Sequence, residues 1–501
     1  MLNFLNTLFA RWISDPNNLI PYLLAIPLCV AILLPFLRKK PNIREGVILI
    51  ASSLLFLGVL YQYLAFMDSS TPITYTFVNV STNLSISFKI EPIGMLFAVV
   101  ATILWPIATV YSIGYMRANK ENFQTRFYTC FAIAIFAVLG IAFASDMFTL
   151  FCFYEMLSIS TFPLVTHKNS AKAMRAGRIY LGILIGTSIG FMLPAIFWTF
   201  YLTGTTEFLN GGILKDKISG LPLMLLLALY IFGIGKAALM PFHKWLPTAM
   251  IAPTPVSALL HAVAVVKAGV FTVLKVIVYI FGIDFLKSQI DYTIWFLYLT
   301  SFTLIASSII ALLQDNLKKR LAYSTISQLA YITMAASLFN PLAIMGGMIH
   351  IAAHAFGKIT LFFAAGSIYT ATHKTEISQL NGLGHKMPVT FACFAIGAIS
   401  MIGLPPAAGF ISKWYLIQGA WSVHSIVAMS AIIISTLLNA AYLIPIVYKG
   451  FFVKATTDIS NYKEAPWPIV LGLTLTASLT ILMFIFPAWA INLARLLTGV
   501  A

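Results

Sequence analysis

The sequence predicts an all-α polytopic membrane protein with about fourteen transmembrane helices and one short hairpin. Of the 501 residues, 60% are hydrophobic and 9% are charged, against roughly 25% charged in soluble domains. Apolar runs of about 20 residues, the length that crosses a bilayer, recur along the whole chain. Only the stretch 73–90 partly alternates β-branched and aromatic residues with polar ones, so we expect the hairpin there, outside the membrane.

The predicted spans follow one another with short connections. We place them at 18–37, 46–66, 92–114, 127–145, 147–166, 178–203, 221–241, 256–281, 293–313, 321–338, 342–371, 389–414, 425–448 and 467–494. Residues 1–17 lack the basic segment, apolar core and small-residue cleavage site of a cleaved signal peptide.

The formal net charge of +16 has a topological explanation. Of the 31 lysines and arginines, 20 lie in one set of alternate loops, six in the other set and five inside spans. Because loops rich in these residues stay in the cytoplasm, the sequence predicts a multi-pass protein of the cell (inner or plasma) membrane with both termini extracytoplasmic. A basic stripe for anionic lipid at 168–178 is a less favoured alternative, and no nucleic-acid partner is expected.

The cysteine and glycine patterns argue against a resident cofactor or metal. The four cysteines, Cys29, Cys130, Cys152 and Cys393, show no CxxC or other close spacing that could hold zinc or an iron-sulfur cluster. No GxGxxG or P-loop pattern follows a strand-like run. We therefore predict no cofactor, no metal site and no redox centre, and expect any energy source on another subunit.

Two lysines, Lys236 and Lys267, lie within the apolar stretch 231–269. A charged side chain at the bilayer centre costs about 2.5–3.5 kcal/mol, so each is a candidate functional residue. Glu155 is the one carboxylate inside a predicted span, and Lys236 is its candidate partner. The alternative is a buried ion pair that only fixes helix register.

Glycines and a proline around Lys236 predict an interrupted helix. Gly233, Gly235 and Pro241 loosen the helix, and a break at that depth has to face a hydrated interior. Interrupted helices at mid-membrane are how many transporters build ion sites.

In the second half, His350, His354 and Lys358 recur at four-residue spacing and so share one helix face. Histidine titrates near neutral pH, and a desolvated lysine can lose its proton, so this column can pass protons stepwise. Lys413 follows a second glycine- and proline-rich stretch, 403–409, which predicts another interrupted span. The parallel with Lys236 suggests an internal repeat with one half-channel in each half.

Three further basic residues have weaker assignments. His243 and His261 are possible gating residues; the alternatives are a place at the membrane interface for His243 and a core histidine bonded to a backbone carbonyl for His261. Lys275 is near the outer end of its span, where we expect its side chain to reach the interface.

Four motifs carry a specific resemblance: MPFHKWLPTAMIAPTPVSALLHAVAVVKAG, YEMLSI, HIAAHAFGKITLFFAAG and GLPPAAGFISKWYL. The chain from about residue 92 to 450 resembles the antiporter-like subunits shared by Mrp-type sodium/proton antiporters and the membrane arms of respiratory complex I and related hydrogenases. ATHKTEISQLNGLGHKMP and FISKWYL are most similar to the Mrp D-type subunit.

The resemblance implies fourteen helices containing two inverted five-helix repeats, with discontinuous seventh and twelfth helices. The expected units are 1–126, helices one to three with the hairpin; 127–281, the first repeat; 293–448, the second; and 467–501, the last helix. The positions that match the family's proton pathway are Glu155, Lys236, Lys267, His350, His354, Lys358 and Lys413. One departure is Glu91, where we would expect aspartate.

The function that this resemblance implies is proton translocation, exchanged against sodium, within a multisubunit Mrp-type antiporter. The partners would be other membrane subunits, protons, sodium and the lipid bilayer. The alternative is a proton-pumping subunit of a complex I-like NADH:quinone oxidoreductase or hydrogenase, which leaves open whether the chain is part of an enzyme. A third possibility is a scaffold subunit that transports nothing.

Overall fold

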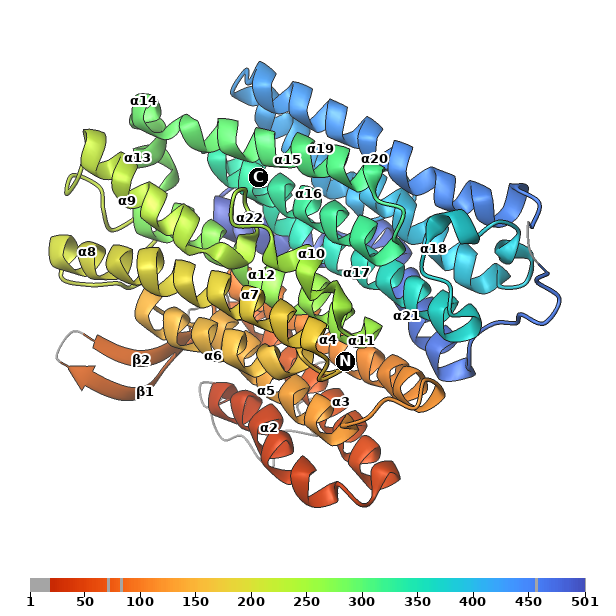
Figure 1. Cartoon of the computed structure of the whole chain (residues 1–501). Helices are drawn as coiled ribbons and strands as arrows, with labels where there is room; N and C mark the ends of the chain where they lie inside the picture. Colours follow the sequence, from red (N-terminus) through yellow and green to blue (C-terminus); the bar gives the residue numbers. More distant parts are fainter. Residues whose placement is uncertain (1–18, 70–72, 82–83, 456–457, 501) are drawn as a thin grey trace.

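The computed structural model describes residues 19–69, 73–81, 84–455 and 458–500, without the side chains of Ser69, Ser81 and His261. The axes of most long helices are roughly aligned, so that the helices form one bundle (Figure 1). The two strands, α13 and α14 lie at one end of this bundle, and the α17–α18 connection lies at the other end (Figure 1). The predictions for residues 1–17 and for the side of the N-terminus fall outside the described residues.

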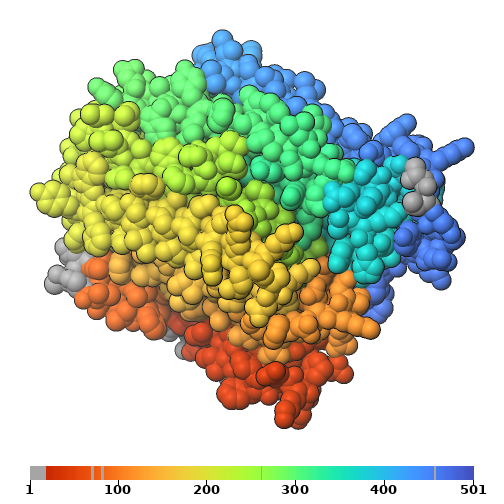
Figure 2. Space-filling view, viewed as in Figure 1, coloured from red at the N-terminus to blue at the C-terminus, as the bar shows by residue number. Residues whose placement is uncertain are grey.

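The first helices are long and mostly uninterrupted. They are α2 (Leu19–Leu33), η2 (Leu34–Leu37), α3 (Pro41–Ser69), α4 (Pro92–Ala118), α5 (Gln124–Phe143), α6 (Met147–Val165), α7 (Ala171–Thr187), η3 (Ser188–Met192) and α8 (Leu193–Thr203). In the space-filling view of Figure 2, the yellow segment around α7 and α8 covers the middle of the visible face, between the red-orange first helices and the green and blue second half.

The middle of the chain is broken into short pieces. They are α9 (Gly220–Gly233), η4 (Gly235–Ala237), α10 (Trp245–Thr248), η5 (Ala249–Ile251), α11 (Thr254–Ala258), η6 (Leu259–Val263), α12 (Val265–Lys275), η7 (Val276–Phe281), α13 (Ile283–Ser288) and α14 (Ile290–Thr293). The interruption predicted around Lys236 is confirmed: α9 ends at Gly233, and Ala238 has a left-handed backbone with φ of 55°.

The second half returns to long helices. They are α15 (Trp295–Leu313), α16 (Leu317–Ser337), α17 (Pro341–Thr372), η8 (Ile377–Gln379), η9 (Leu383–His385), α18 (Pro388–Ile402), α19 (Gly409–Ser422), α20 (Ile426–Phe452), α21 (Trp467–Ile485) and α22 (Ala488–Thr498). The second predicted interruption is confirmed between α18 and α19.

Ten helices of the described residues are long and apolar enough to cross a membrane, and two shorter apolar helices are Gly220–Gly233 and Pro388–Ile402. The chain is therefore a multi-pass membrane protein, as the composition predicts. The final span, expected to be continuous over 467–494, instead stops at Ile485, and a new helix begins after Pro487. Proline has no N–H to donate and ends the hydrogen-bond ladder there.

The predicted hairpin is confirmed as β1 (Thr74–Ser81) and β2 (Leu84–Lys89), which pair antiparallel with Thr74 opposite Lys89. The hairpin packs against the start of α6, where the Ser87 backbone N–H donates to Thr149 Oγ1 at 3.1 Å. We refer to the end of the bundle that carries β1 and β2 as the hairpin face.

The centre of the bundle is α17. Its membrane-spanning window is entirely buried within the protein, and it packs against α16, α18, α19 and α21. Lipid-facing helices, by contrast, expose large apolar side chains such as Tyr201 at 85% and Leu437 at 68%. The helix with the His350, His354 and Lys358 column is thus shielded from lipid on all sides.

Candidate functional site

Lys236 lies in the break between α9 and α10 and is fully buried. Its ammonium nitrogen donates to the Tyr154 carbonyl oxygen and to Ser158 Oγ, both at 2.7 Å, and lies 3.1 Å from the centroid of the Tyr154 ring. Its backbone N–H donates to Tyr154 Oη at 3.1 Å. The interrupted segment is therefore fastened to one face of α6.

Glu155 lies on the same helix, between the two residues that Lys236 contacts. Both of its carboxylate oxygens are buried and lack a hydrogen-bond partner among the described residues. No ion pair within 4.0 Å joins it to Lys236 in the part of the chain that the structure describes. Since Lys236 contacts Tyr154 and Ser158 on either side of Glu155, the two groups are neighbours without a direct bond.

Lys267 joins the first half of the chain to α17. It is fully buried on α12, and its ammonium nitrogen lies 2.5 Å from His354 Nδ1. Two residues further along α12, Gly269 lies directly on the backbone of Lys236, so that an added Cβ would collide with it. Glycine at this position therefore brings α12 against the break that holds Lys236.

His350 lies one turn before His354 on α17, with the two ring centroids 6.0 Å apart. Its Nδ1 is 2.8 Å from Ser412 Oγ on α19, and its Nε2 is 3.1 Å from Gln328 Oε1 on α16. Both ring nitrogens therefore have a hydrogen-bonding neighbour, which allows the ring to take a proton on one side and release one on the other.

Lys413 is buried at the second break. Its ammonium nitrogen donates to the carbonyl oxygens of Met401 and Ile402 at 3.0 and 2.9 Å. These residues end α18, where the last carbonyls of a helix have no partner within the helix. A cation is favourable at that negative end of the helix dipole.

The Met401 carbonyl oxygen is also the point where two polar branches meet. Gln328 Nε2 donates to it at 3.2 Å, which connects it to His350. Asn439 Nδ2 donates to it at 3.3 Å, and Asn439 Oδ1 accepts from Tyr442 Oη. Lys413, Gln328 and Asn439 thus share one acceptor.

The second branch ends at Lys358. The Lys358 ammonium donates to Ser324 Oγ at 2.7 Å, and Tyr442 Oη lies 2.9 Å from the same oxygen. The Lys358–Ser324–Tyr442–Asn439 branch therefore links the last member of the α17 column to Met401 without passing through either histidine. The sequence predictions missed Ser324, Gln328, Asn439 and Tyr442, although an amide side chain such as Asn439 inside an apolar span was a usable signal.

Of the two possible gating residues, His243 is half-buried in the connection after the break. Its ring centroid is 6.4 Å from that of Tyr323, and its Nδ1 has no partner among the described residues. His243 makes no hydrogen bond to Lys236 or Lys267 in the described structure. His261 falls in η6, but its side chain lies outside the described part of the chain.

The expectation that Lys275 reaches the membrane interface is wrong. Its side chain is fully buried, and its ammonium nitrogen lies 3.0 Å from a carboxylate oxygen of Glu91. It also donates to the Ala144 carbonyl oxygen at 2.8 Å. An ion-pair partner placed at the start of α4 holds this lysine inside the protein.

Known proteins share both sequence and fold with this chain. A family model described as "NADH:quinone oxidoreductase/Mrp antiporter, TM" matches residues 144–439, and one described as "NADH-Ubiquinone oxidoreductase (complex I), chain 5 N-terminus" matches residues 77–128. The A-type subunit of the Na(+)/H(+) antiporter from Alkalihalophilus pseudofirmus is 30% identical in an alignment that covers 92% of this chain and 60% of that protein. NADH-quinone oxidoreductase subunit N of Desulforudis audaxviator is 29% identical over 76% of each chain.

Solved structures show the same fold at low sequence identity. A chain of the Mrp complex from Dietzia sp. superposes with a TM-score of 0.85 and 17% identity, over 97% of both chains. A chain of the membrane-bound sulfane sulfur reductase, an archaeal respiratory membrane complex, superposes with a TM-score of 0.84 and 24% identity, over 96% of this chain and 97% of that one. With the family model spanning both breaks and the α17 column, the chain belongs to the NADH:quinone oxidoreductase/Mrp antiporter family of membrane proteins.

Proposed function

We propose that this chain is a proton-translocating subunit of a multisubunit Na⁺/H⁺ antiporter of Mrp type in the cell membrane, with both termini extracytoplasmic. Its partners would be the other membrane subunits of that assembly. The Mrp-type relatives and the four motifs support this assignment. Similarity to the D-type subunit stays a prediction from sequence, as do the unit boundaries and the two inverted repeats.

The observation that carries the proposal is a line of buried polar groups through the centre of the bundle. It runs from Lys267 to His354 and His350, and then through Gln328 to the Met401 carbonyl that Lys413 also contacts. Lysine and histidine side chains can each gain or lose a proton when desolvated in protein. A scaffold that only held helices together would not need ionisable groups along its lipid-free core.

Lys236 and Glu155 supply the gate in this scheme. The Lys236 ammonium donates hydrogen bonds to the Tyr154 carbonyl oxygen and to Ser158 Oγ, and Glu155 lies between these two residues on α6. Since the two charges lie more than 4.0 Å apart, their attraction is below about 4 kcal/mol at an effective dielectric near 20. A change in that attraction would let Lys236 pass its proton toward Lys267, which α12 carries; Gly269 packs that helix against the Lys236 backbone.

The test is proton flux in the assembled complex carrying Lys236→Ala or Glu155→Gln. We expect each change to lower sodium-dependent proton flux by about 100-fold, the usual range for losing one positioned proton-transfer group. Lys244→Ala is the matched control, because Lys244 is an exposed lysine on the same connection. Wild-type flux in both Lys236→Ala and Glu155→Gln would overturn the proposal.

The alternative function is a proton-pumping subunit of a redox-driven, complex I-like assembly. The similarity to NADH-quinone oxidoreductase subunit N and to the archaeal respiratory complex favours it. The two functions separate when the purified complex is reconstituted with a pH gradient. Dissipation on adding Na⁺ alone supports antiport, whereas a requirement for an electron donor supports the redox-driven complex.

A further inference from the structure

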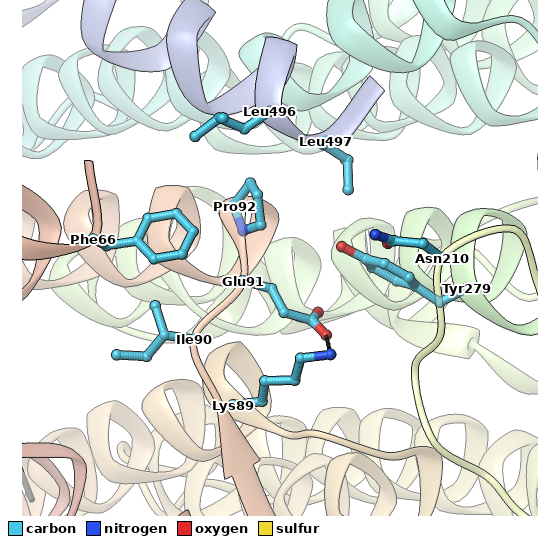
Figure 3. A pocket seen from close by; sticks show the side chains of 9 residues that line it. All are labelled: Phe66, Lys89, Ile90, Glu91, Pro92, Asn210, Tyr279, Leu496 and Leu497. Carbon is cyan, nitrogen blue, oxygen red and sulfur yellow. Dashed lines mark ion pairs between the residues drawn. The ribbon is translucent and has the colours of Figure 1, made fainter. Parts of the chain in front are cut away.

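Outside the line already described, the structure contains a second group of buried charges on the hairpin face. Glu91, at the start of α4, is 4% exposed, and its two carboxylate oxygens lie 3.0 Å from Lys275 Nζ and 3.4 Å from Lys89 Nζ. Figure 3 shows Lys89 and Glu91 paired, with Tyr279 and Asn210 opposite them. The carboxylate makes no capping bond to α4, so its contacts go to the two lysines instead.

A pocket of about 150 Å³ lies beside this group. Lys89, Glu91, Asn210 and Tyr279 supply its polar lining, with apolar side chains from α3, α4 and α22 around them (Figure 3). At about 30 Å³ per molecule, it has room for roughly five waters, and it offers them several polar partners. The side chain of Lys89 is 24% exposed, so the group reaches the surface on that side.

The same short helix carries both this group and the central line. Lys267 and Lys275 lie eight residues apart on α12, about 12 Å along the helix axis. One of them contacts His354 in the core, and the other contacts Glu91 at the hairpin face. Proton transfer over that distance would require intervening water, and the pocket reaches Glu91, the ion-pair partner of Lys275.

We propose that Lys275, Glu91 and Lys89 form the proton port of the hairpin face, through which protons pass between Lys267 and the water outside. This inference rests on the proposed function and extends it to residues that the family resemblance did not assign. The distribution of basic loops makes this the extracytoplasmic side.

The surrounding charges fit a site that exchanges protons rather than one that holds a fixed ion. Besides Lys89 and Glu91, Asp146 at the start of α6 faces Lys275, and the Tyr279 ring centroid lies 5.8 Å from Lys275 Nζ. With two lysines and two carboxylates the group is close to neutral, so the net charge offers no selective site for Na⁺. Gain or loss of one proton therefore changes the net charge of this group.

The experiment measures flux against the pH on the hairpin side alone, in sealed vesicles of known orientation containing the whole complex. The variants are Glu91→Gln, Lys275→Gln, the double variant and Glu91→Asp. We expect each single variant and the double variant to lose at least about tenfold in flux and to alter the dependence on hairpin-side pH, with Glu91→Asp retaining activity. The dependence on the pH of the opposite side should not change.

A buried ion pair with only a structural role predicts a different pattern. The double variant would then regain wild-type flux, because neither charge is left without a partner, and that result would overturn the proposal. Glu45→Gln is the matched control, since Glu45 is a buried carboxylate paired with Arg44 and Arg117 in a separate part of the protein. Co-purification of the other subunits checks assembly, and the double variant and Glu91→Asp carry the test if a single variant fails to assemble.

Lys236→Ala in the same vesicles separates this inference from the proposed function. If Lys236→Ala abolishes flux while the Glu91 and Lys275 variants transport normally, the port is wrong and the central line stands. If Lys236→Ala also transports normally, the proposed function itself fails.

Discussion

The Lys267 ammonium nitrogen lies 2.5 Å from His354 Nδ1, and this contact joins α12 to α17. Through this contact, the buried polar groups of the first half of the chain connect to His350, His354 and Lys358 on α17.

His354→Phe keeps a ring of similar size but removes both ring nitrogens. Because a positioned proton-transfer group contributes about 100-fold or more, we expect flux to fall by that factor while the complex still assembles. Proton flux in vesicles is the measurement. His424→Phe, at an exposed position before α20, should leave flux unchanged, and equal activity of the two variants would contradict a role for His354 in transfer.

Gly269→Ala should displace the break that carries Lys236. An added Cβ would collide with the Lys236 carbonyl group, and backbone cannot move aside as a flexible side chain can. We expect a lower melting temperature and reduced flux, with a cost of about 1–3 kcal/mol typical of overpacking. Gly182→Ala on α7 is the control, because nothing lies within 4 Å of its added Cβ, and it should stabilise the helix by up to about 1 kcal/mol.

Tyr442→Phe tests the branch that runs from Lys358 to Met401. The change removes only Oη, which contacts Ser324 and Asn439, and keeps the buried ring. We expect flux to fall about tenfold or more if this branch carries protons. Tyr230→Phe is matched to it, since Tyr230 is also buried with a hydroxyl group bonded to Thr199 at 2.8 Å, outside the line. Similar flux in both variants would assign Tyr442 to packing alone.

Lys318 should titrate near neutral pH. It lies at the start of α16, outside the predicted span, and its ammonium donates to the Ala252 carbonyl oxygen. Burial lowers the pKa of Lys318 to about 7, Lys168 lowers it as well, and Glu121 opposes the shift. Labelling of its amine by an acylating reagent, read by mass spectrometry, should therefore reach half its maximum near pH 7, with the exposed Lys319 in the same digest reporting reagent reactivity.

The same shift sets the sign of a stability effect. An unfolded chain keeps lysine protonated up to about pH 10.4, whereas folded Lys318 releases its proton above about 7. Between these values the unfolded state binds more protons, so the free energy of unfolding rises with pH. Below about pH 7 both states are protonated, and the full cost of burying the charged amine opposes folding. Lys318→Met should remove that part of the pH dependence of the melting temperature, and an unchanged slope would contradict the shift.

The features that the sequence predicts well are local ones. The break at Lys236 follows from glycines and a proline within a few residues, and the face shared by His350, His354 and Lys358 follows from helical periodicity alone. Both can be recognised in one short stretch, without knowing which helices are neighbours.

The features that the sequence does not predict depend on contacts between distant segments. Burial of Lys275 depends on Glu91, which comes from a different helix, directly after the hairpin. The same holds for Lys236, whose ammonium goes to a backbone carbonyl and a serine next to Glu155 rather than to the carboxylate itself. The sequence periodicity of α12 or α6 does not specify which atom of a neighbouring helix will accept a hydrogen bond from a buried lysine.

The enclosure of α17 has a consequence for how the protein is made. Three of the helices that surround it, α18, α19 and α21, come later in the chain, so α17 leaves the ribosome before these three neighbours exist. Until they arrive, its polar side chains have partners only on earlier segments: Lys267 for His354, Gln328 for His350 and Ser324 for Lys358. The side of α17 that α18, α19 and α21 will cover still faces lipid or water. Stable integration of α17 should therefore need the helices that follow it, and truncation after residue 372 should leave this segment poorly integrated in the bilayer.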